Sequence, residues 1–222
     1  MPPVVDTSLL RDVPLLTELS EEEMATIEAA TSATDLLRGD LLFAEGETPT
    51  HLHVVVNGRV AISKRSVDGR ESMVALMERG DVLGEMSLFD GLGRSAEARA
   101  LEPSQVLTIP FEPLRAIYEN RPALLWSVVH LLVSRLRSTD TALADSVFLD
   151  VTGRTAKRLL ELAGEDDEFV LPITQEELAG MVGASRERVN KAIASFVRLR
   201  WIEQHDRRYR ITNREELERR AR

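Results

Sequence analysis

Short apolar runs separated by glycines dominate the chain from Leu36 to Ile109. The runs have the length of β-strands and comprise Leu41–Phe43, Val54–Val56, Val60–Ile62, Met73–Met77 and Val106–Ile109. Eight of the 12 glycines fall between Gly39 and Gly93, where they mark the turns. This alternation predicts a compact antiparallel barrel or sandwich, with Asp68-Gly69 as a hairpin turn.

A long uninterrupted helix is predicted after Pro122, because no glycine or proline occurs from Ala123 to Leu149. Apolar residues recur along it at steps of three and four, at Leu125, Val129, Leu132, Leu136, Leu143 and Val147. A stripe this narrow favours pairing with a second helix, so we expect a two-fold dimer. Thr139 interrupts the stripe. It either fixes the register of the paired helices or faces a ligand that reaches the dimer axis.

Capping residues locate the other helices. Ser20 with Glu23, and Thr174 with Glu177, have the spacing of capping boxes. Asp150 or Thr152 is available to cap a helix that follows the long one, and we place a domain boundary there.

A helix-turn-helix pattern follows Thr174. Gly183 ends its first helix and Ser185 can cap its second. The inward face of the second helix comprises Val189, Ala192, Ile193 and Phe196, so its outward face near the N-terminus comprises Arg186, Glu187, Asn190 and Lys191. Such a face is where a recognition helix meets base edges.

A basic surface continues beyond this helix. Nine Lys and Arg stand against three Asp and Glu from Gly183 to Arg214. Residues 201–212 have the pattern of a two-stranded wing that carries Arg207, Arg208 and Arg210. The surface either lies against DNA or is a solvated charged face.

Charge divides the chain at the same place. The 222 residues carry a net charge of −9, which separates into −11 for residues 1–150 and +2 for residues 151–222. This asymmetry indicates two domains with different partners. The absence of cysteine excludes disulfides, thiolate catalysis and cysteine-bound iron-sulfur clusters. No apolar run reaches the roughly 18 residues of a membrane span, and the N-terminal residues lack a basic region followed by an apolar one, so we expect a cytoplasmic protein.

The stretch Gly84–Ala96 carries the candidate chemistry. Its glycines permit close backbone approach, Arg94 offers a planar fork for a phosphate, and Ser95 adds a hydroxyl and an amide. Glu85 can accept hydrogen bonds from a sugar hydroxyl. The combination predicts a sugar-phosphate site. The alternative is a surface turn whose charged side chains are solvated.

An enzyme is not expected. The four histidines, His51, His53, His130 and His205, have neither metal-ligand nor triad spacing. The first two alternate in a strand-like run, and we expect both at the surface.

Two motifs resemble those of the catabolite activator / cyclic-AMP receptor (CRP/FNR) family of bacterial transcription regulators. Gly84-Glu85, followed by Arg94-Ser95-Ala96, resembles the family's phosphate-binding cassette, and Ser185-Arg186-Glu187-Arg188-Val189 resembles its Ser-Arg-Glu-Thr-Val recognition helix. The resemblance implies that Glu85 holds the ribose 2′-hydroxyl and Arg94 the cyclic phosphate. It also implies that Thr139 bonds the adenine, with Arg135 one turn earlier. Asp140 stands where the family usually has Ser or Asn from the partner subunit.

The resemblance also implies a fold and its domains. The fold class is α+β, with a cyclic-nucleotide-binding β-roll of jelly-roll type over residues 1–121, a dimerisation helix over residues 122–149, and a winged helix-turn-helix over residues 150–222. The run Phe148–Arg154 resembles the family's hinge, where a ligand-driven change in helix length reorients the second domain.

The implied function is a cyclic AMP (cAMP)-responsive homodimer that binds a pseudo-palindromic DNA operator and RNA polymerase. The nucleotide-binding residues would be Gly84, Glu85, Met86, Arg94, Ser95, Arg135, Thr139 and Asp140. The DNA-binding residues would be Thr174, Ser185, Arg186, Glu187, Asn190, Lys191, Arg207, Arg208 and Arg210. Three alternatives stay open: a haem-based gas sensor of the same superfamily, a member that binds DNA without ligand, and a nucleotide-binding regulatory subunit that acts on a protein partner.

Overall fold

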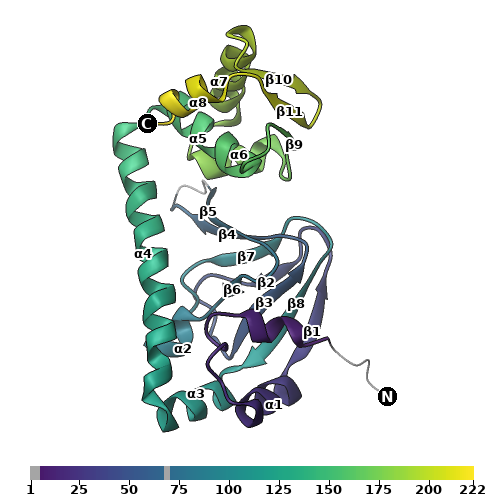
Figure 1. The fold of residues 1–222 in the computed structure, drawn as a ribbon, viewed down its shortest axis with the longest axis vertical. Coiled ribbons are helices and arrows are strands. Elements are labelled where there is room, and N and C mark those ends of the chain that lie inside the picture. The colour runs from purple at the N-terminus through teal and green to yellow at the C-terminus, as the bar shows by residue number, and fades with distance from the viewer. Residues whose placement is uncertain (1–5, 68–70) are drawn as a thin grey trace. The chain divides into compact units, whose positions relative to one another are not determined.

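The computed structural model describes residues 6–67 and 71–222. The predicted Asp68-Gly69 turn therefore lies outside the described residues. The chain divides into two compact units, one comprising residues 1–70 and 74–136 and the other residues 71–73 and 137–222 (Figure 1). Each unit is described by itself.

The first unit contains two four-stranded sheets and several short helices. Its elements in chain order are η1 (Ser8–Asp12), α1 (Glu21–Ala30), β1 (Ser32–Leu36), β2 (Leu41–Phe43), β3 (His51–Asn57), β4 (Val60–Arg65), β5 (Glu71–Met77), β6 (Val82–Leu83), α2 (Met86–Asp90), β7 (Glu97–Ala100), β8 (Ser104–Pro110), α3 (Phe111–Asn120) and η2 (Pro122–Leu124). One sheet has the order β1-β8-β3-β6 and the other β2-β7-β4-β5. The predicted antiparallel sandwich is confirmed by this arrangement.

Side chains on β3 alternate between two cores. Leu52 and Val54 belong to a cluster with residues of η1, α1, α3 and the start of the long helix, whereas Val55 belongs to a cluster drawn from strands of both sheets. The sheet that contains β3 is therefore covered by helices on one face and by the other sheet on its opposite face. Because both faces are covered, β3 is buried over four consecutive residues.

Local signals explain where the elements begin and end. The capping box of Ser20 and Glu23 is confirmed at the start of α1. The sequence predicts a turn through Gly84–Ala96, but part of that segment, Met86–Asp90, folds as α2. Gly91 ends this helix with a φ of 69°, a left-handed conformation that glycine adopts without strain.

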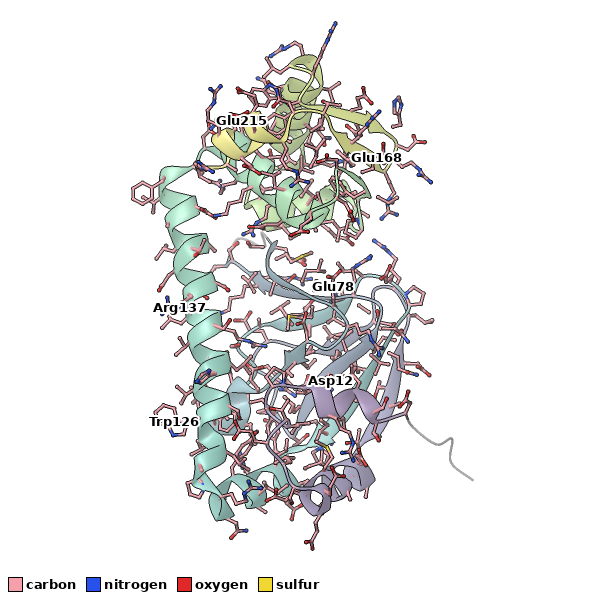
Figure 2. All side chains as sticks on the ribbon, viewed as in Figure 1. Asp12, Glu78, Trp126, Arg137, Glu168 and Glu215 are labelled. Carbon is pink, nitrogen blue, oxygen red and sulfur yellow. The ribbon has the colours of Figure 1, made fainter. Side chains whose placement is uncertain are left out.

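The long helix α4 runs from Leu125 to Phe148. Pro122 begins the preceding 3-10 turn, η2, rather than α4 itself. Of the α4 side chains, only Val128 is buried. Trp126 points away from the sheets of the first unit (Figure 2).

The second unit is a helical domain with a small sheet. Beyond α4 its elements are α5 (Val151–Ala163), β9 (Glu168–Val170), α6 (Gln175–Val182), α7 (Arg186–Arg198), β10 (Ile202–His205), β11 (Arg208–Ile211) and α8 (Arg214–Arg220). The predicted wing, β10 with β11, is confirmed, and β9 joins it as an unpredicted third strand. The predicted caps are confirmed at Asp150, Thr174, Gly183 and Ser185.

No helix within residues 6–67 and 71–222 is long and apolar enough to cross a membrane. Those residues also contain no group of three acidic or histidine side chains placed to hold a metal ion.

Candidate functional site

Arg94 is the centre of the first site, and it is almost completely buried, with 5% of its surface exposed. Its Nη1 donates to the carbonyl of Gly84 at 3.0 Å, and its Nη2 donates to the carbonyl of His51 at 2.7 Å. The guanidinium lies over the ring of Phe43, 4.2 Å from its centroid. These contacts hold a full positive charge inside the unit, where burial lowers the pKa of Arg94.

The backbone around Arg94 is held by a neighbouring loop. The amide of Arg94 donates to the carbonyl of Glu47 at 3.0 Å, and its carbonyl accepts from the amide of Gly46 at 2.8 Å. A Cβ on Gly93 would lie 2.9 Å from the carbonyl oxygen of Gly46. Only glycine therefore permits the two segments to approach this closely.

Gly84 is required for a similar reason. Its φ is +84°, and a Cβ at this position would overlap Nη1 of Arg94. The glycine thus admits the guanidinium to the backbone carbonyl that anchors it.

Glu85 has no exposed surface. Its carboxylate forms an ion pair with Nη1 of Arg135 on α4, and Nη2 of Arg135 donates to the carbonyl of Val82. Burial raises the pKa of Glu85, while Arg135 acts in the opposite direction. The structure brings together Glu85 and Arg135, which are 50 positions apart in the sequence.

Two polar atoms in this site have no hydrogen-bond partner among the described residues. They are Nε of Arg94, which is a donor, and Oε2 of Glu85, which is an acceptor, and both are buried. Unpaired buried polar atoms are costly in a folded protein, so each requires an explanation. A phosphate oxygen would satisfy the donor and a sugar hydroxyl would satisfy the acceptor.

Four of the remaining candidate nucleotide-binding residues are exposed, unlike Arg94 and Glu85. The hydroxyl of Ser95 lies 3.8 Å from the sulfur of Met86, and both residues are exposed. Thr139 and Asp140 are exposed residues of α4 that follow Arg135 by about one turn and belong to the second unit.

The expectation that His53 lies at the surface is wrong, since only 6% of its surface is exposed. Its strand, β3, is an interior strand of a sheet that is covered on both faces, so alternation along β3 does not separate buried from exposed positions. Its neighbour His51 is half-buried.

A second candidate site lies on α6, α7 and the wing. Thr174 and Ser185 cap α6 and α7, where their hydroxyls accept from the amides of Glu177 and Arg188. The exposed side chains at the start of α7 are Arg186, Glu187, Arg188 and Lys191. Thr174, Arg186 and Arg207 line one shallow depression, together with Tyr209, although they come from three different elements.

Asn190 departs from its predicted place. It is only partly exposed, and its Oδ1 is buried without a hydrogen-bond partner in the described residues. It directly follows the fully buried Val189, so its side chain lies at the border between the inward and outward faces of α7.

The three arginines of the wing are not equivalent. Arg208 is exposed. Arg207 donates from Nη2 to the carbonyl of Leu171 at 2.9 Å. Arg210 lies between two carboxylates, with Nε 3.2 Å from Glu168 and Nη1 3.8 Å from Glu203. Because β9 pairs with β11 and places Glu168 opposite Arg210, the charge of this arginine is partly neutralised.

Two further cations on α7, Arg188 and Arg198, were counted in the predicted basic surface but were not named among the DNA-binding residues. Arg188 and Arg198 share a groove with Lys191 and with Thr152 at the start of α5. Positions 188, 191 and 198 are separated by three and seven residues, a helical spacing that could have identified this basic side from the sequence.

Comparison with known families assigns both parts of the chain. Residues 33–121 match the family model of the cyclic nucleotide-binding domain, and residues 153–220 match that of the Crp-like helix-turn-helix domain.

Similar proteins include two named regulators. The CRP-like cAMP-activated global transcriptional regulator of Mycobacterium tuberculosis is 38% identical over 206 residues, which cover 90% of this chain and 92% of that protein. The cAMP-activated global transcriptional regulator CRP of Salmonella typhimurium is 33% identical over 159 residues, covering 68% of this chain and 76% of that protein.

Solved structures have the same fold. FixK2 from Bradyrhizobium japonicum aligns with a TM-score of 0.77 at 20% identity, covering 85% of this chain and 96% of that one. The catabolite activator protein of Thermus thermophilus aligns with a TM-score of 0.52 at 28% identity, covering 94% and 98%.

Proposed function

This chain belongs to the CRP/FNR family of cyclic-nucleotide-responsive, DNA-binding transcription regulators, which are not enzymes, and from that membership we propose that it acts as a cAMP-dependent homodimer. The single observation that supports nucleotide binding most directly is the pair of unpartnered buried atoms, Arg94 Nε and Glu85 Oε2. In the proposal the cyclic phosphate accepts a hydrogen bond from Arg94 Nε, and the ribose 2′-hydroxyl donates one to Glu85 Oε2.

The proposed nucleotide site continues from the cassette onto α4. In the proposal, Gly84, Met86 and Ser95 surround the phosphate and ribose, and Arg135 holds Glu85 in place. As the family resemblance implies, Thr139 bonds the base, and Asp140 is supplied to it by the partner subunit. Asp140 is an acceptor when ionised, whereas the exocyclic amino group of adenine is a donor. This complementarity favours cAMP over cyclic GMP, which carries a carbonyl at the corresponding ring position.

The proposed dimer is held by α4. The apolar stripe predicted from the sequence is exposed in the single chain, and its members Leu125, Val129, Leu132, Leu136, Leu143 and Val147 are 38% to 67% exposed. Exposed apolar stripes of this regularity are typical of helices that pair. We assign residues 1–121 to nucleotide binding, 122–149 to dimerisation and 150–222 to DNA binding.

The proposed DNA interface uses the start of α7 for the bases. Arg186 and Glu187 are exposed where a recognition helix enters the major groove, and Lys191 follows one turn later. Thr174, Ser185, Asn190 and the wing residues Arg207, Arg208 and Arg210 complete the interface. Contacts to phosphates by the wing position the helix without reading the sequence. RNA polymerase is a further proposed partner of the DNA-bound dimer.

The proposed mechanism is linkage between the two ligands. A nucleotide that binds the cassette also touches α4, and α4 leads through Phe148–Arg154 into α5. The nucleotide binds more tightly to the arrangement in which two α7 helices fit successive major grooves, and it therefore raises the affinity of the protein for DNA. By linkage, bound DNA raises the affinity for the nucleotide by the same factor.

Calorimetry of the nucleotide-free protein with cAMP and with cyclic GMP tests the proposal. We expect cAMP to bind one site per chain, cyclic GMP to bind more weakly, and Arg94→Ala to remove most of the cAMP affinity. Arg99→Ala is a matched control, because this arginine pairs with Glu97 on β7 and does not belong to the cassette. Equal binding of cAMP by wild type and Arg94→Ala would refute the assigned site.

A salt-dependent DNA shift assay tests the second half of the proposal. We expect DNA binding that weakens steeply with salt and strengthens with cAMP. Nucleotide binding without any DNA binding would instead identify a regulatory subunit.

A further inference from the structure

His53 contacts Arg94, the arginine that is proposed to bind the phosphate. Its ring stacks on the ring of Phe43, with centroids 5.7 Å apart, and the guanidinium of Arg94 lies over the same Phe43 ring. Nε2 of His53 is 3.5 Å from Nη2 of Arg94. The three side chains come from β2, β3 and the cassette, and all three are buried.

The contact with Arg94 determines which nitrogen of the ring carries the proton. Nδ1 of His53 is 3.2 Å from the hydroxyl of Thr108, and that hydroxyl is 3.2 Å from the hydroxyl of Thr34. Arginine can only donate, so Nε2 must be the acceptor. Nδ1 then carries the hydrogen and donates to the hydroxyl of Thr108.

The ring is neutral in this arrangement. Burial, reinforced by the charge of Arg94, lowers the pKa of His53 to about 3. A neutral ring with its lone pair at Nε2 attracts the neighbouring guanidinium, whereas a charged ring would repel it.

The terminal nitrogens of Arg94 anchor its side chain to the protein, whereas its Nε is unpaired. Nη1 donates to the carbonyl of Gly84, and Nη2 donates to the carbonyl of His51 and toward His53. Within residues 6–67 and 71–222, His53 is the one side chain that accepts a hydrogen bond from this guanidinium. Nε remains without a partner in the described part of the chain.

We propose that His53 is a positioning residue for the cyclic phosphate, because its acceptor nitrogen holds Nη2 of Arg94 and so helps the backbone carbonyls to present Nε–H to the ligand. This inference rests on the proposed nucleotide function of Arg94. Thr108 supports it by accepting the hydrogen bond from Nδ1 of His53. The ring itself does not touch the nucleotide.

Two substitutions distinguish the effect of the acceptor atom of His53 from the effect of its ring shape. His53→Phe keeps a flat ring over Phe43 but removes the acceptor, and His53→Gln places an amide oxygen near the position of Nε2 without a ring. We expect His53→Phe to weaken cAMP binding by about tenfold, as for loss of a hydrogen bond to a charged group. We expect His53→Gln to restore most of that affinity. Thermal unfolding of each nucleotide-free variant verifies that it is folded.

A double-mutant cycle tests whether the effect passes through Arg94. In an Arg94→Lys background, which keeps the charge but loses the fork, His53→Phe should cost little further affinity. A purely structural role for His53 would instead give the same loss in both backgrounds. Equal losses, or a His53→Gln variant as weak as His53→Phe, would overturn the proposal.

A measurement on the nucleotide-free protein tests the positioning role of His53 independently of cAMP binding. The NMR signals of the Arg94 guanidinium report whether its amino groups rotate freely. We expect restricted rotation in wild type and His53→Gln, and faster rotation in His53→Phe. Identical signals in the three proteins would refute the positioning role even if cAMP binds. Absence of cAMP binding by wild type would refute the nucleotide function, and with it the proposed positioning of phosphate.

Discussion

Arg135 on α4 forms an ion pair with Glu85, a carboxylate that has no exposed surface. The pair joins the cassette to the helix that carries the proposed dimer stripe. The guanidinium is partly exposed, so the desolvation cost falls mainly on the carboxylate. Burial raises the pKa of Glu85 and Arg135 counteracts that effect.

Arg135→Met should therefore destabilise the protein in a pH-dependent way. Without the cation the pKa of Glu85 rises further in the folded protein. Stability is then lost as the pH increases from the ordinary pKa of glutamate through the raised pKa of the folded state. At neutral pH we expect a cost of about 1 to 3 kcal/mol in the free energy of unfolding. Urea unfolding at pH 5 and pH 7.5 measures it. Arg137→Met, at an exposed position on the same helix, is the control, and an equal cost for Arg135→Met at both pH values would contradict the prediction.

His53 should make the protein sensitive to acid. Its pKa is about 3 in the folded protein and close to 6.5 in the unfolded chain, so the unfolded state binds one more proton between these values. Stability should fall as pH is lowered through this window, by up to about 1.4 kcal/mol per pH unit from this group. His53→Gln should remove that part of the dependence. Urea unfolding of both proteins from pH 4 to pH 7 measures it, and parallel curves would show that His53 does not contribute.

The stripe on α4 should hold the dimer together. Replacing both Leu132 and Leu136 by Lys places like charges on the proposed seam, so we expect monomers. Light scattering measures the mass. Leu37→Lys is the control, since this leucine is also exposed but lies between β1 and β2, away from α4. An unchanged dimer mass for the double variant would place the interface elsewhere.

Arg186 should read one base pair in each half-site. Two recognition helices related by a two-fold axis require a pseudo-palindrome with half-sites about 34 Å apart. Arg186 can pair with both acceptors of a guanine, and such a contact discriminates by about 1 to 3 kcal/mol. Selection of bound sites from a random DNA pool should yield a symmetric motif, and Arg186→Ala should lose preference at one position of it. A motif without symmetry, or one that Arg186→Ala leaves unchanged, would exclude this readout.

The wing arginines should differ in their effect on salt dependence. Each phosphate contact contributes roughly 0.9 to the slope of log affinity against log salt. Arg208→Ala should reduce the slope by about that amount, whereas Arg210→Ala should reduce it less, because Glu168 and Glu203 already neutralise part of the charge of Arg210. DNA-binding titrations at several salt concentrations measure both slopes. Equal reductions would show that the carboxylates release Arg210 when DNA binds.

Local features of this chain could be predicted from its sequence because they depend on neighbouring residues. Capping boxes at Ser20 and Thr174, the glycine end of α6 at Gly183, and the strand runs each involve hydrogen bonds or periodicity within a few positions. The cassette residues Glu85 and Arg94 were also identified locally, by the types of residue in one short stretch. Elements without such signals, including α3, β9 and α8, were not predicted.

Contacts between distant segments were decided only by the tertiary structure. The burial of His53 depends on β3 lying inside a covered sheet, and the neutralisation of Arg210 depends on a third strand that brings Glu168 beside it. The sequence determined which side chains can bind a phosphate or a base, since that follows from their chemistry. Folding decided which of their atoms remain unpaired for a ligand, because pairing depends on groups that are far apart in the chain.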